Sequence, residues 1–216
     1  ARALIRHVVD NGNFFEMREL YASGLITGFA RLDGWSVGVI GSDPMSKAGA
    51  MDGNAADKYT HFVDLCDTFN LPLLIFLDMP GFMLGSHAER IATMRRGARA
   101  LIASAECQVP KIEFMVRKSY GVAADAPNSI GLPDSINLRF GWPSGEWGGI
   151  PIEGGVAAAY RREIEAADDP DAHREAIEER LLRLRSPFRA AHRGDVVDLI
   201  DPRETRSLAC RFVNLA

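Results

Sequence analysis

The sequence predicts a single-domain α/β fold. Two predominantly apolar segments of strand length, the continuous run at residues 73–78 and a second at 112–116, each follow a stretch in which apolar residues recur at helical spacing. Each segment runs into a glycine turn, so one unit of helix, proline, strand and glycine loop occurs twice. The 216 residues are 47% hydrophobic and 25% charged, which suffices for one well-buried domain, and no shift in composition indicates a second.

The first expected element is a β-hairpin formed by residues 25–32 and 35–40. Both segments have the composition and length of strands. Asp33 and Gly34 lie between them, and this dipeptide readily adopts the positive φ values of a tight hairpin turn.

Two helix–strand units follow the hairpin. Residues 54–69 carry apolar side chains on one helical face, and Asn54 is the expected N-cap. The strand at 73–78 comes next. The second unit consists of a helix over residues 88–106 and the strand at 112–116.

The last third of the chain is expected to return once to the sheet and then to become helical. A strand is predicted at residues 136–142, followed by a glycine-dense loop at 145–155. Residues 156–185 are charged and helical in pattern, which is typical of a solvent-facing helical hairpin or a subunit contact. Residues 196–201 are expected to be extended, and Pro202 suits the first turn of a final helix.

Composition excludes several functional classes. The formal net charge of -4 offers no basic excess for binding nucleic acid. The longest apolar run, residues 71–77, is far shorter than the roughly 20 residues of a membrane span, so no membrane partner is expected. The cysteines are three in number and lack a C-x-x-C pair, which favours a reducing, cytoplasmic location and disfavours a zinc site.

Familiar catalytic motifs are missing from the sequence. The five histidines are scattered, and there is no G-x-S-x-G elbow, phosphate-binding P-loop or G-x-G-x-x-G. What remains is backbone chemistry at the glycine turns of residues 78–82 and 120–124. Such turns leave amide N–H groups without helical partners, which suits the stabilisation of an anionic oxygen. Ordinary strand-to-helix turns use glycine as well, but the repetition of the turn favours the functional interpretation.

Longer stretches of the sequence resemble the carboxyltransferase (β) subunits of biotin-dependent acyl-CoA carboxylases, of the propionyl-CoA or acetyl-CoA type. The segments that carry the resemblance are residues 28–40, 55–70, 77–82, 95–98, 110–111, 117–121, 153–156 and 197–206. They occur in the family's order along essentially the whole chain. Only the C-terminal half of the family pattern is present, because the Ser-Gly-Gly-Ala-Arg motif of the first half is missing.

The resemblance implies a crotonase-like ββα superhelix, with residues 1–216 forming the C-terminal, biotin-side carboxyltransferase domain. It implies an enzyme that transfers a carboxyl group from carboxybiotin, held on a carrier protein, to the α-carbon of a short-chain acyl-CoA in fatty acid metabolism. The implied partners are an N-terminal carboxyltransferase half, biotin carboxylase and the biotin carrier protein. The resemblance also implies an oligomer, with a hexamer as the expected form. No metal is expected in this chain.

The resemblance also assigns roles to three groups of residues. The backbone N–H groups of the loop after Tyr120 are implied to stabilise the biotin enolate, and Asp125 falls on the family position for acyl-chain discrimination. The implied catalytic residues are Gly121, Val122 and Ala123, the substrate-binding residues are Tyr120, Ala124 and Asp125, and the biotin-binding residues are Pro80, Gly81 and Phe82.

Several positions depart from the family pattern. The family usually has glycine at Val122, an aromatic residue at Ala124 and no proline as close behind as Pro127. The Val122 amide keeps its place as a donor only if its φ is negative. The departures keep other interpretations open, namely a non-catalytic assembly or regulatory subunit and a biotin-dependent acyl-CoA decarboxylase. A hydratase or decarboxylase of the crotonase type without biotin is disfavoured by the matches at 117–121 and 201–206.

Overall fold

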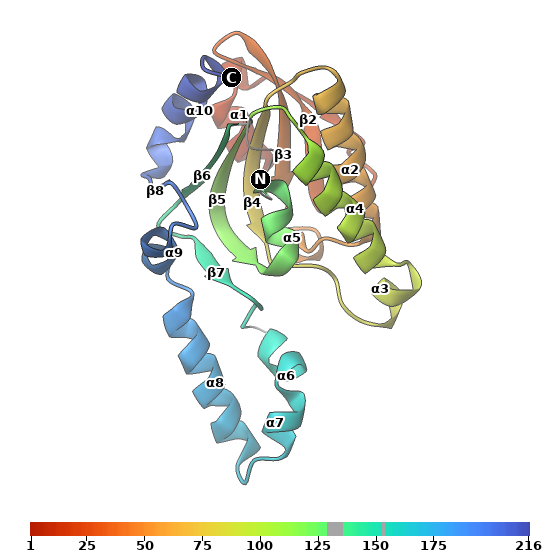
Figure 1. Ribbon diagram of the computed structural model, residues 1–216, viewed down its shortest axis with the longest axis vertical. Coiled ribbons are helices and arrows are strands. Elements are labelled where there is room, and N and C mark those ends of the chain that lie inside the picture. The colour runs from red at the N-terminus through yellow and green to blue at the C-terminus, as the bar shows by residue number, and fades with distance from the viewer. Residues whose placement is uncertain (129–135, 153) are drawn as a thin grey trace.

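A single mixed sheet with helices on both faces forms the body of the molecule (Figure 1). The computed structural model describes residues 1–128, 136–152 and 154–216. The strands run in the order β1-β2-β3-β4-β5-β6-β8, and β7 pairs with β5. The strands are β1 (Phe14–Met17), β2 (Leu25–Leu32), β3 (Trp35–Ser42), β4 (Leu73–Met79), β5 (Lys111–Tyr120), β6 (Asn137–Gly141), β7 (Glu146–Gly148) and β8 (Asp198–Leu199).

Helices connect and cover these strands. The α-helices are α1 (Arg2–Val8), α2 (Gly53–Thr68), α3 (Ser86–Arg90), α4 (Thr93–Glu106), α5 (Gly121–Asp125), α6 (Gly155–Ala159), α7 (Arg161–Glu165), α8 (Pro170–Leu184), α9 (Pro187–Arg193) and α10 (Thr205–Val213). Short 3-10 turns lie at Asp10–Gly12, Lys47–Gly49, Ala126–Asn128 and Pro202–Glu204. Within the described ranges, no helix has the length and apolarity of a membrane span.

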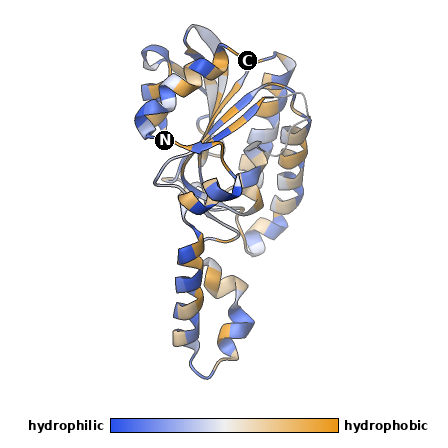
Figure 2. Cartoon of the chain, turned by 60° about the vertical axis from the view of Figure 1, so that its left-hand side comes forward, coloured by the Kyte–Doolittle hydropathy of each residue, from blue (hydrophilic) through white to orange (hydrophobic). Residues whose placement is uncertain are grey.

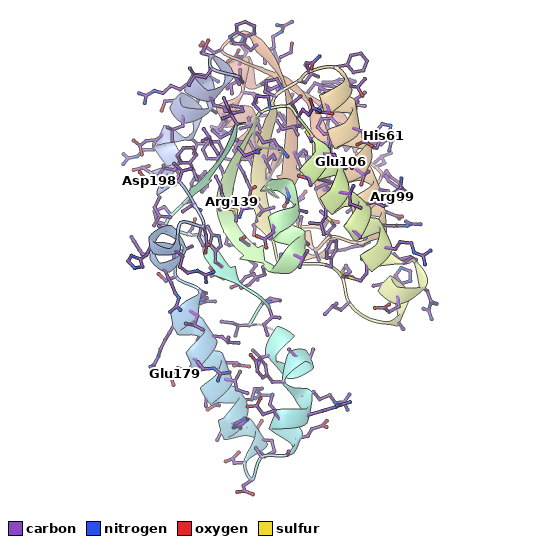
Figure 3. All side chains as sticks on the ribbon, viewed as in Figure 1. His61, Arg99, Glu106, Arg139, Glu179 and Asp198 are labelled. Atoms are coloured by element: carbon purple, nitrogen blue, oxygen red, sulfur yellow. The ribbon has the colours of Figure 1, made fainter. Side chains whose placement is uncertain are left out.

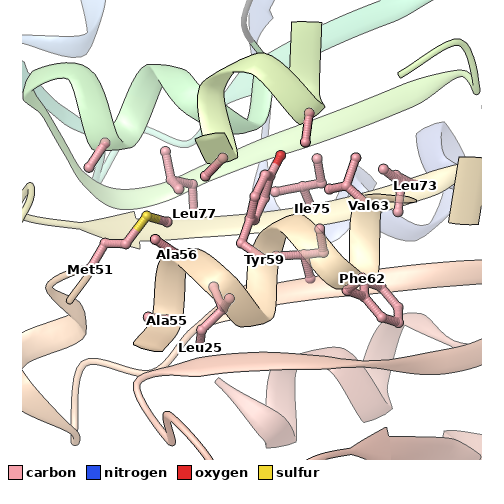
Figure 4. Packing of buried hydrophobic residues seen from close by; sticks show 14 of the residues in the cluster. Leu25, Met51, Ala55, Ala56, Tyr59, Phe62, Val63, Leu73, Ile75 and Leu77 are labelled. Atoms are coloured by element: carbon pink, nitrogen blue, oxygen red, sulfur yellow. The ribbon is translucent and has the colours of Figure 1, made fainter. Parts of the chain in front are cut away.

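The side chains on the two faces of β4 pack into two separate hydrophobic cores, which explains the continuous apolar sequence of this strand. Every residue of β4 is buried. Leu73 and Ile75 pack with α2 and α4, whereas Leu74 and Phe76 pack with α1 and α10 on the opposite face. Figure 4 shows Tyr59 of α2 lying against β4 in the first core. The α/β class predicted from this run of residues is therefore confirmed.

The predicted hairpin is also confirmed. Leu32 pairs with Trp35 across the turn, and the two strands are antiparallel throughout. Asp33 and Gly34 have φ values of 52° and 84°, as a two-residue type I′ turn requires.

Two predicted helices differ from the structure. The N-cap of α2 is Asp52 and not Asn54, because the Asp52 carboxylate accepts the Ala55 N–H at 2.8 Å. The helix expected over residues 88–106 is divided into α3 and α4, since Ala92 between them is left-handed with a φ of 54°.

The charged segment predicted as one helical stretch forms three helices. Asp169 caps α8 by accepting the Ala172 N–H, and Pro170 occupies its first turn, so α8 starts anew after α7. Helices α6, α7 and α8 form an arm that projects from the sheet (Figures 1 and 2). A small core of Ile152, Val156 and Ile177 holds the arm together. The helices of the arm turn back on one another, as expected of a helical hairpin.

Some elements were not predicted at all: α1, β1, β7 and α9. Each is short, from three to seven residues, and lacks a clear apolar period. β7 lies within the loop expected at residues 145–155 and pairs with the far end of β5, where Ser119 faces Trp147. This pairing brings the arm next to the end of β5.

Candidate functional site

The two glycine turns singled out in the sequence lie side by side in the structure. Strands β4 and β5 are parallel neighbours, and Met79 pairs with Ser119 at the end of both. The turn after β4 begins immediately beside Tyr120. A Cβ added to Gly81 would lie 3.4 Å from the Tyr120 carbonyl oxygen, and the φ of Gly81 is 122°. The positive φ is the reason that glycine is needed at this position, since the added Cβ would make only an ordinary van der Waals contact.

At the end of β5 the chain reverses sharply into α5. Gly121 has a φ of 63° and starts the helix. Val122 is not among the residues with positive φ, so the condition for keeping its amide in place is met. Its side chain is 55% exposed, whereas Ala123 and Ala124 are buried in the core beneath α5. The first amides of a helix have no acceptor one turn earlier, which leaves those of Val122 and Ala123 without an intrahelical partner.

A cavity of about 960 Å³ opens between this turn and the helical arm. Its lining residues come from the end of β5, from α5 and β7, from β6 and from the arm with α9. They are Ser119, Tyr120, Gly121, Val122, Asp125, Arg139, Trp147, Gly148, Gly149, Ile150, Ile152, Ala159, Tyr160, Leu181, Leu184, Arg185, Arg189, Ala190, Arg193 and Asp195. Four of these side chains are arginines and two are aspartates, so the charged part of this lining is predominantly cationic.

The cavity brings together only part of the predicted site. Tyr120, Gly121, Val122 and Asp125 line it. The remaining predicted residues do not, namely Ala123 and Ala124 of α5 and Pro80, Gly81 and Phe82 of the turn after β4. Of the family motif at residues 153–156, Glu153 lies outside the described residues.

Phe82 instead packs on a helix. A Cβ added to Gly97 of α4 would lie 2.4 Å from the Phe82 ring, so the ring rests directly on the α4 backbone. Phe82 also bridges to Met51, whose N–H bonds to the Gly81 carbonyl. The turn after β4 is thus held by α4 and by the segment before α2, while the biotin-binding role of Pro80, Gly81 and Phe82 stays a prediction.

Tyr120 is fixed from the arm side of the cavity. Its hydroxyl donates to Glu146 Oε2 at 2.9 Å, and Arg185 lies 3.4 Å from the same carboxylate. Burial is the main cause of the raised pKa of Tyr120, and the bond to Glu146 adds to it, so the phenol stays neutral. Tyr120 is consequently a donor oriented by Glu146 and not a base.

Asp78 ties the ends of β4 and β5 together. Its carboxylate accepts the Lys118 backbone N–H at 3.1 Å and forms an ion pair with Arg117 at 3.1 Å. The register between the strands shifts at this point, between Leu77 and Met79. These bonds hold the two strand ends at the irregularity that precedes both turns.

Neither Cys66 nor Cys107 lines the cavity. Burial raises the pKa of the Cys66 thiol to about 12 and that of Cys107 to about 11, so both stay protonated. Among the residues that the structure describes, no cluster of His, Cys, Asp and Glu could hold a metal ion.

Several cavity residues escaped the sequence analysis, in particular Arg139, Trp147 and Tyr160. They come from β6, β7 and the arm, which are far from the glycine turns in the sequence and meet them only in the folded chain. One signal was available, because Glu113 interrupts an apolar strand and its register partner on β6 is Arg139. A charged residue inside a buried strand indicates a charged partner nearby.

Comparison with known proteins assigns the family. The family model "Carboxyl transferase domain" matches residues 1–216. The chain belongs to this carboxyl transferase family. The carboxyltransferase subunit of propionyl-CoA carboxylase from Haloferax mediterranei is 42% identical over 205 residues, which cover 94% of this chain and 39% of the relative. The methylmalonyl-CoA carboxyltransferase 12S subunit of Propionibacterium freudenreichii subsp. shermanii is 42% identical over 206 residues, with 95% and 39% covered.

Solved structures of the family have the same fold. The hexameric transcarboxylase 12S, crystallised with methylmalonyl-coenzyme A and methylmalonic acid, superposes with a TM-score of 0.86 at 39% identity, covering 99% of this chain and 41% of that chain. The β subunit of geranyl-CoA carboxylase from P. aeruginosa superposes with a TM-score of 0.88 at 22% identity, covering 99% and 40%, and supports the fold alone. The predicted crotonase-like class is confirmed. The chain spans about 40% of the length of the relatives it matches.

Proposed function

We propose that this chain is the C-terminal, biotin-side half of a carboxyltransferase that transfers a carboxyl group from carboxybiotin to the α-carbon of a short-chain acyl-CoA. One observation carries the proposal: the turn formed by Tyr120, Gly121 and Val122 lines a cavity of about 960 Å³ in a chain that the carboxyl transferase model matches over residues 1–216. The acyl group is of the propionyl or acetyl type, since the relatives include propionyl-CoA carboxylases.

The residues around the turn fit a flat cyclic urea such as the biotin ring. Gly121, Gly148 and Gly149 line the cavity beside Val122. Because glycine has no Cβ, a ligand can approach the backbone closely at these positions. A Cβ on Gly149 would meet no atom within 4 Å, which leaves room next to the turn. When bound there, carboxybiotin supplies the carboxyl group to be transferred.

In this proposal the amides of Val122 and Ala123 do the chemical work of the chain, with Val122 at the cavity wall and Ala123 buried directly behind it. Two backbone donors aimed at one oxygen stabilise the negative charge that develops on it, and fixed donors need no reorganisation during the reaction. Gly121 sets their direction through its positive φ, and Tyr120 is held beside them by Glu146. Asp125 lies further along the cavity, at the place where the acyl group would enter.

The complete enzyme requires further parts. We infer that an N-terminal carboxyltransferase half, on the same or another chain, completes the site, and that biotin carboxylase and a biotin carrier protein act with it. A hexamer is the expected assembly, as in the transcarboxylase 12S. A cytoplasmic location follows from the cysteine pattern in the sequence.

The test is carboxyl transfer from malonyl-CoA or methylmalonyl-CoA to free biocytin, with this chain combined with its first-half partner. Val122→Pro removes one amide donor, and we expect transfer to fall about a hundredfold or more. Proline is tolerated in the first turn of a helix, and circular dichroism checks that the variant folds. Val122→Ala keeps the N–H and serves as the matched control. Absence of transfer by the wild-type chain for every acyl-CoA tried would contradict the catalytic proposal and favour an assembly subunit.

A decarboxylase is the second candidate. The alpha subunit of methylmalonyl-CoA decarboxylase from Propionigenium modestum is 38% identical over 204 residues, which cover 94% of this chain and 39% of the relative. Both reactions move a carboxyl group between a thioester and biotin. The direction is decided by the partner chains, and it is measured as net release or uptake of CO2 in the reconstituted complex.

A further inference from the structure

A buried pair of opposite charges lies behind the cavity. Glu113 on β5 is 0% exposed, and it stands in register with Arg139 on the neighbouring strand β6 (Arg139 is labelled in Figure 3). Arg139 Nη2 lies 3.5 Å from Glu113 Oε2, and the Arg139 side chain is 13% exposed. Burial raises the pKa of the Glu113 carboxyl, and the Arg139 guanidinium opposes that rise.

The hydrogen-bonding capacity of this pair is largely unused. Within the described part of the chain, neither Glu113 oxygen has a hydrogen-bond partner, and the same holds for Arg139 Nε and Nη2. Buried polar groups of native proteins are normally bonded, so an unbonded pair needs an explanation. A pair required only for stability would be expected to close into the short, bidentate geometry that arginine and carboxylate adopt.

The other side of the Arg139 guanidinium faces the cavity. Nη1 lies 3.6 Å from Asp125 Oδ1, a distance too long for a hydrogen bond. Both residues line the cavity, and the Asp125 side chain is 68% exposed. Asp125 is therefore a loosely held partner that can turn into solvent.

We propose that Arg139 binds a carboxylate of the ligand that enters this cavity, that Asp125 occupies this place while the cavity is empty, and that Glu113 is a positioning residue for Arg139. A guanidinium offers a planar fork of donors that matches a carboxylate, and it keeps its charge at all relevant pH values. The guanidinium is held from behind by the rigid sheet. The ligand carboxylate takes over the contact that Asp125 makes at 3.6 Å.

The rest of the cavity suits such a ligand. Arg189 of α9 adds positive charge, which attracts anions into the cavity, whereas Arg193 forms an ion pair with Asp195 at 3.5 Å. Ile150, Ile152 and Leu181 provide an apolar wall for a short acyl chain. The identity of the carboxylate rests on the proposed function: carboxyl transfer converts an acyl thioester into one that carries a carboxylate. The subsite therefore distinguishes the carboxylated thioester from the uncarboxylated one.

The experiment measures binding of malonate, a small probe that carries a carboxylate on a short acyl chain, to the whole chain by calorimetry at constant ionic strength. Malonamide is the neutral probe of the same shape. We expect wild-type protein to bind malonate and to bind malonamide at least about tenfold more weakly, as the loss of charged hydrogen bonds predicts. Arg139→Met should lower malonate affinity about tenfold or more, whereas Asp125→Asn should raise it, because the competing carboxylate is removed.

Two further variants keep the result decisive. Arg183→Met removes an exposed arginine of α8 that does not line the cavity, and it should leave malonate binding unchanged. If Arg139→Met fails to fold because Glu113 loses its partner, the double variant Glu113→Leu with Arg139→Met removes both charges and should fold without binding malonate. Equal affinity for malonate and malonamide, or unchanged malonate binding without Arg139, would overturn the inference.

Malonate binding and carboxyl transfer to biocytin are separate measurements, so failure of one is distinguishable from failure of the other. If the chain binds malonate through Arg139 but transfers no carboxyl group, the subsite is supported and the proposed enzymatic function is contradicted. If the Arg139→Met variant transfers carboxyl groups with full activity and binds malonate as well as the wild type does, the enzymatic function is supported and the subsite is contradicted.

Discussion

Asp10 connects three parts of the chain that are far apart in the sequence. Its carboxylate accepts the Gly34 N–H at 2.8 Å and the Asp33 N–H at 3.1 Å, and it bonds to Arg206 at 2.7 Å. The bond from Gly34 contributes most to the lowered pKa of Asp10, followed by Arg206. One carboxylate thus fastens the hairpin turn to both ends of the chain.

This lowered pKa predicts a specific dependence of stability on pH. A carboxyl whose pKa is lower in the folded than in the unfolded chain stabilises the fold above about pH 4, and the contribution disappears as the pH falls through the folded value. We expect Asp10→Asn to lower the free energy of unfolding by about 1 kcal/mol at pH 6, after allowance for solvent screening, and to have a smaller effect at pH 2.5, which lies below the ordinary pKa of the carboxyl. Urea unfolding at the two pH values measures the difference.

Asp168→Asn is the control for Asp10, because Asp168 is an exposed carboxylate between α7 and α8. Its stability should follow that of the wild type at both pH values. A loss in Asp10→Asn that is equally large at pH 2.5 would show that the turn is stabilised by shape and not by the charged carboxylate.

Residue-level chemistry is also where the sequence was least informative. The apolar run of β4 correctly predicted that this strand is buried. The charged residues Lys58, Lys111 and Glu113 are as buried as the core, and the sequence did not indicate this. Lys58 shows the reason, because its ammonium donates to the carbonyls of Arg18, Tyr21 and Leu25. Such partners are distant in sequence and are bound through backbone carbonyls, so no period or motif reveals them.

At the scale of elements, the contact between α4 and the turn after β4 depends on one missing side chain. Gly97 in α4 costs helix stability relative to alanine, by roughly 1 kcal/mol. The compensating feature is the Phe82 ring, which lies where a Gly97 Cβ would be. Glycine at position 97 lowers the intrinsic stability of α4, but it allows the turn after β4 to pack closely against the helix.

We therefore expect Gly97→Ala to lower stability by about 1–3 kcal/mol despite the better helix propensity, because the added methyl group overpacks against the ring. Combining it with Phe82→Leu makes room, and the double variant should be more stable than Gly97→Ala alone. Thermal unfolding of the single and double variants measures the coupling. Ala98→Ser, on the exposed face of the same helix, is the control. A stabilising effect of Gly97→Ala alone would contradict the assigned packing.

Elements with a strong local pattern were predicted and those without one were not. The hairpin, α2, β4 and β5 combine an apolar period with clear turn residues. The division at Ala92 had no such signal, since alanine is the best helix former and yet has a φ of 54° here. For the same reason the glycine turns of the site were predicted, whereas the cavity beside them, which needs β6, β7 and the arm, was not.

At the scale of the whole molecule, the sheet and the arm differ greatly in the size of their cores. The sheet is packed on both faces by extended apolar clusters, whereas Ile152, Val156 and Ile177 are the buried residues of the arm's cluster. The arm meets the body mainly through β7, α9 and the contact of Arg185 with Glu146. One wall of the cavity is thus built from the less stable part of the molecule.

This difference predicts that the arm opens before the sheet does. Amide hydrogen exchange followed by mass spectrometry should give a lower opening free energy for α7 and α8 than for β4 and β5. Ile177→Ala should lower the opening free energy of the arm by about 2–4 kcal/mol and so speed amide exchange in α8. The protection of the β4 amides should stay unchanged. Ile102→Ala on α4, where the side chain is 55% exposed, is the control and should alter neither region. Equal loss of protection in α8 and β4 upon Ile177→Ala would instead show that arm and sheet unfold as one cooperative unit, and that the cavity wall is as stable as the core.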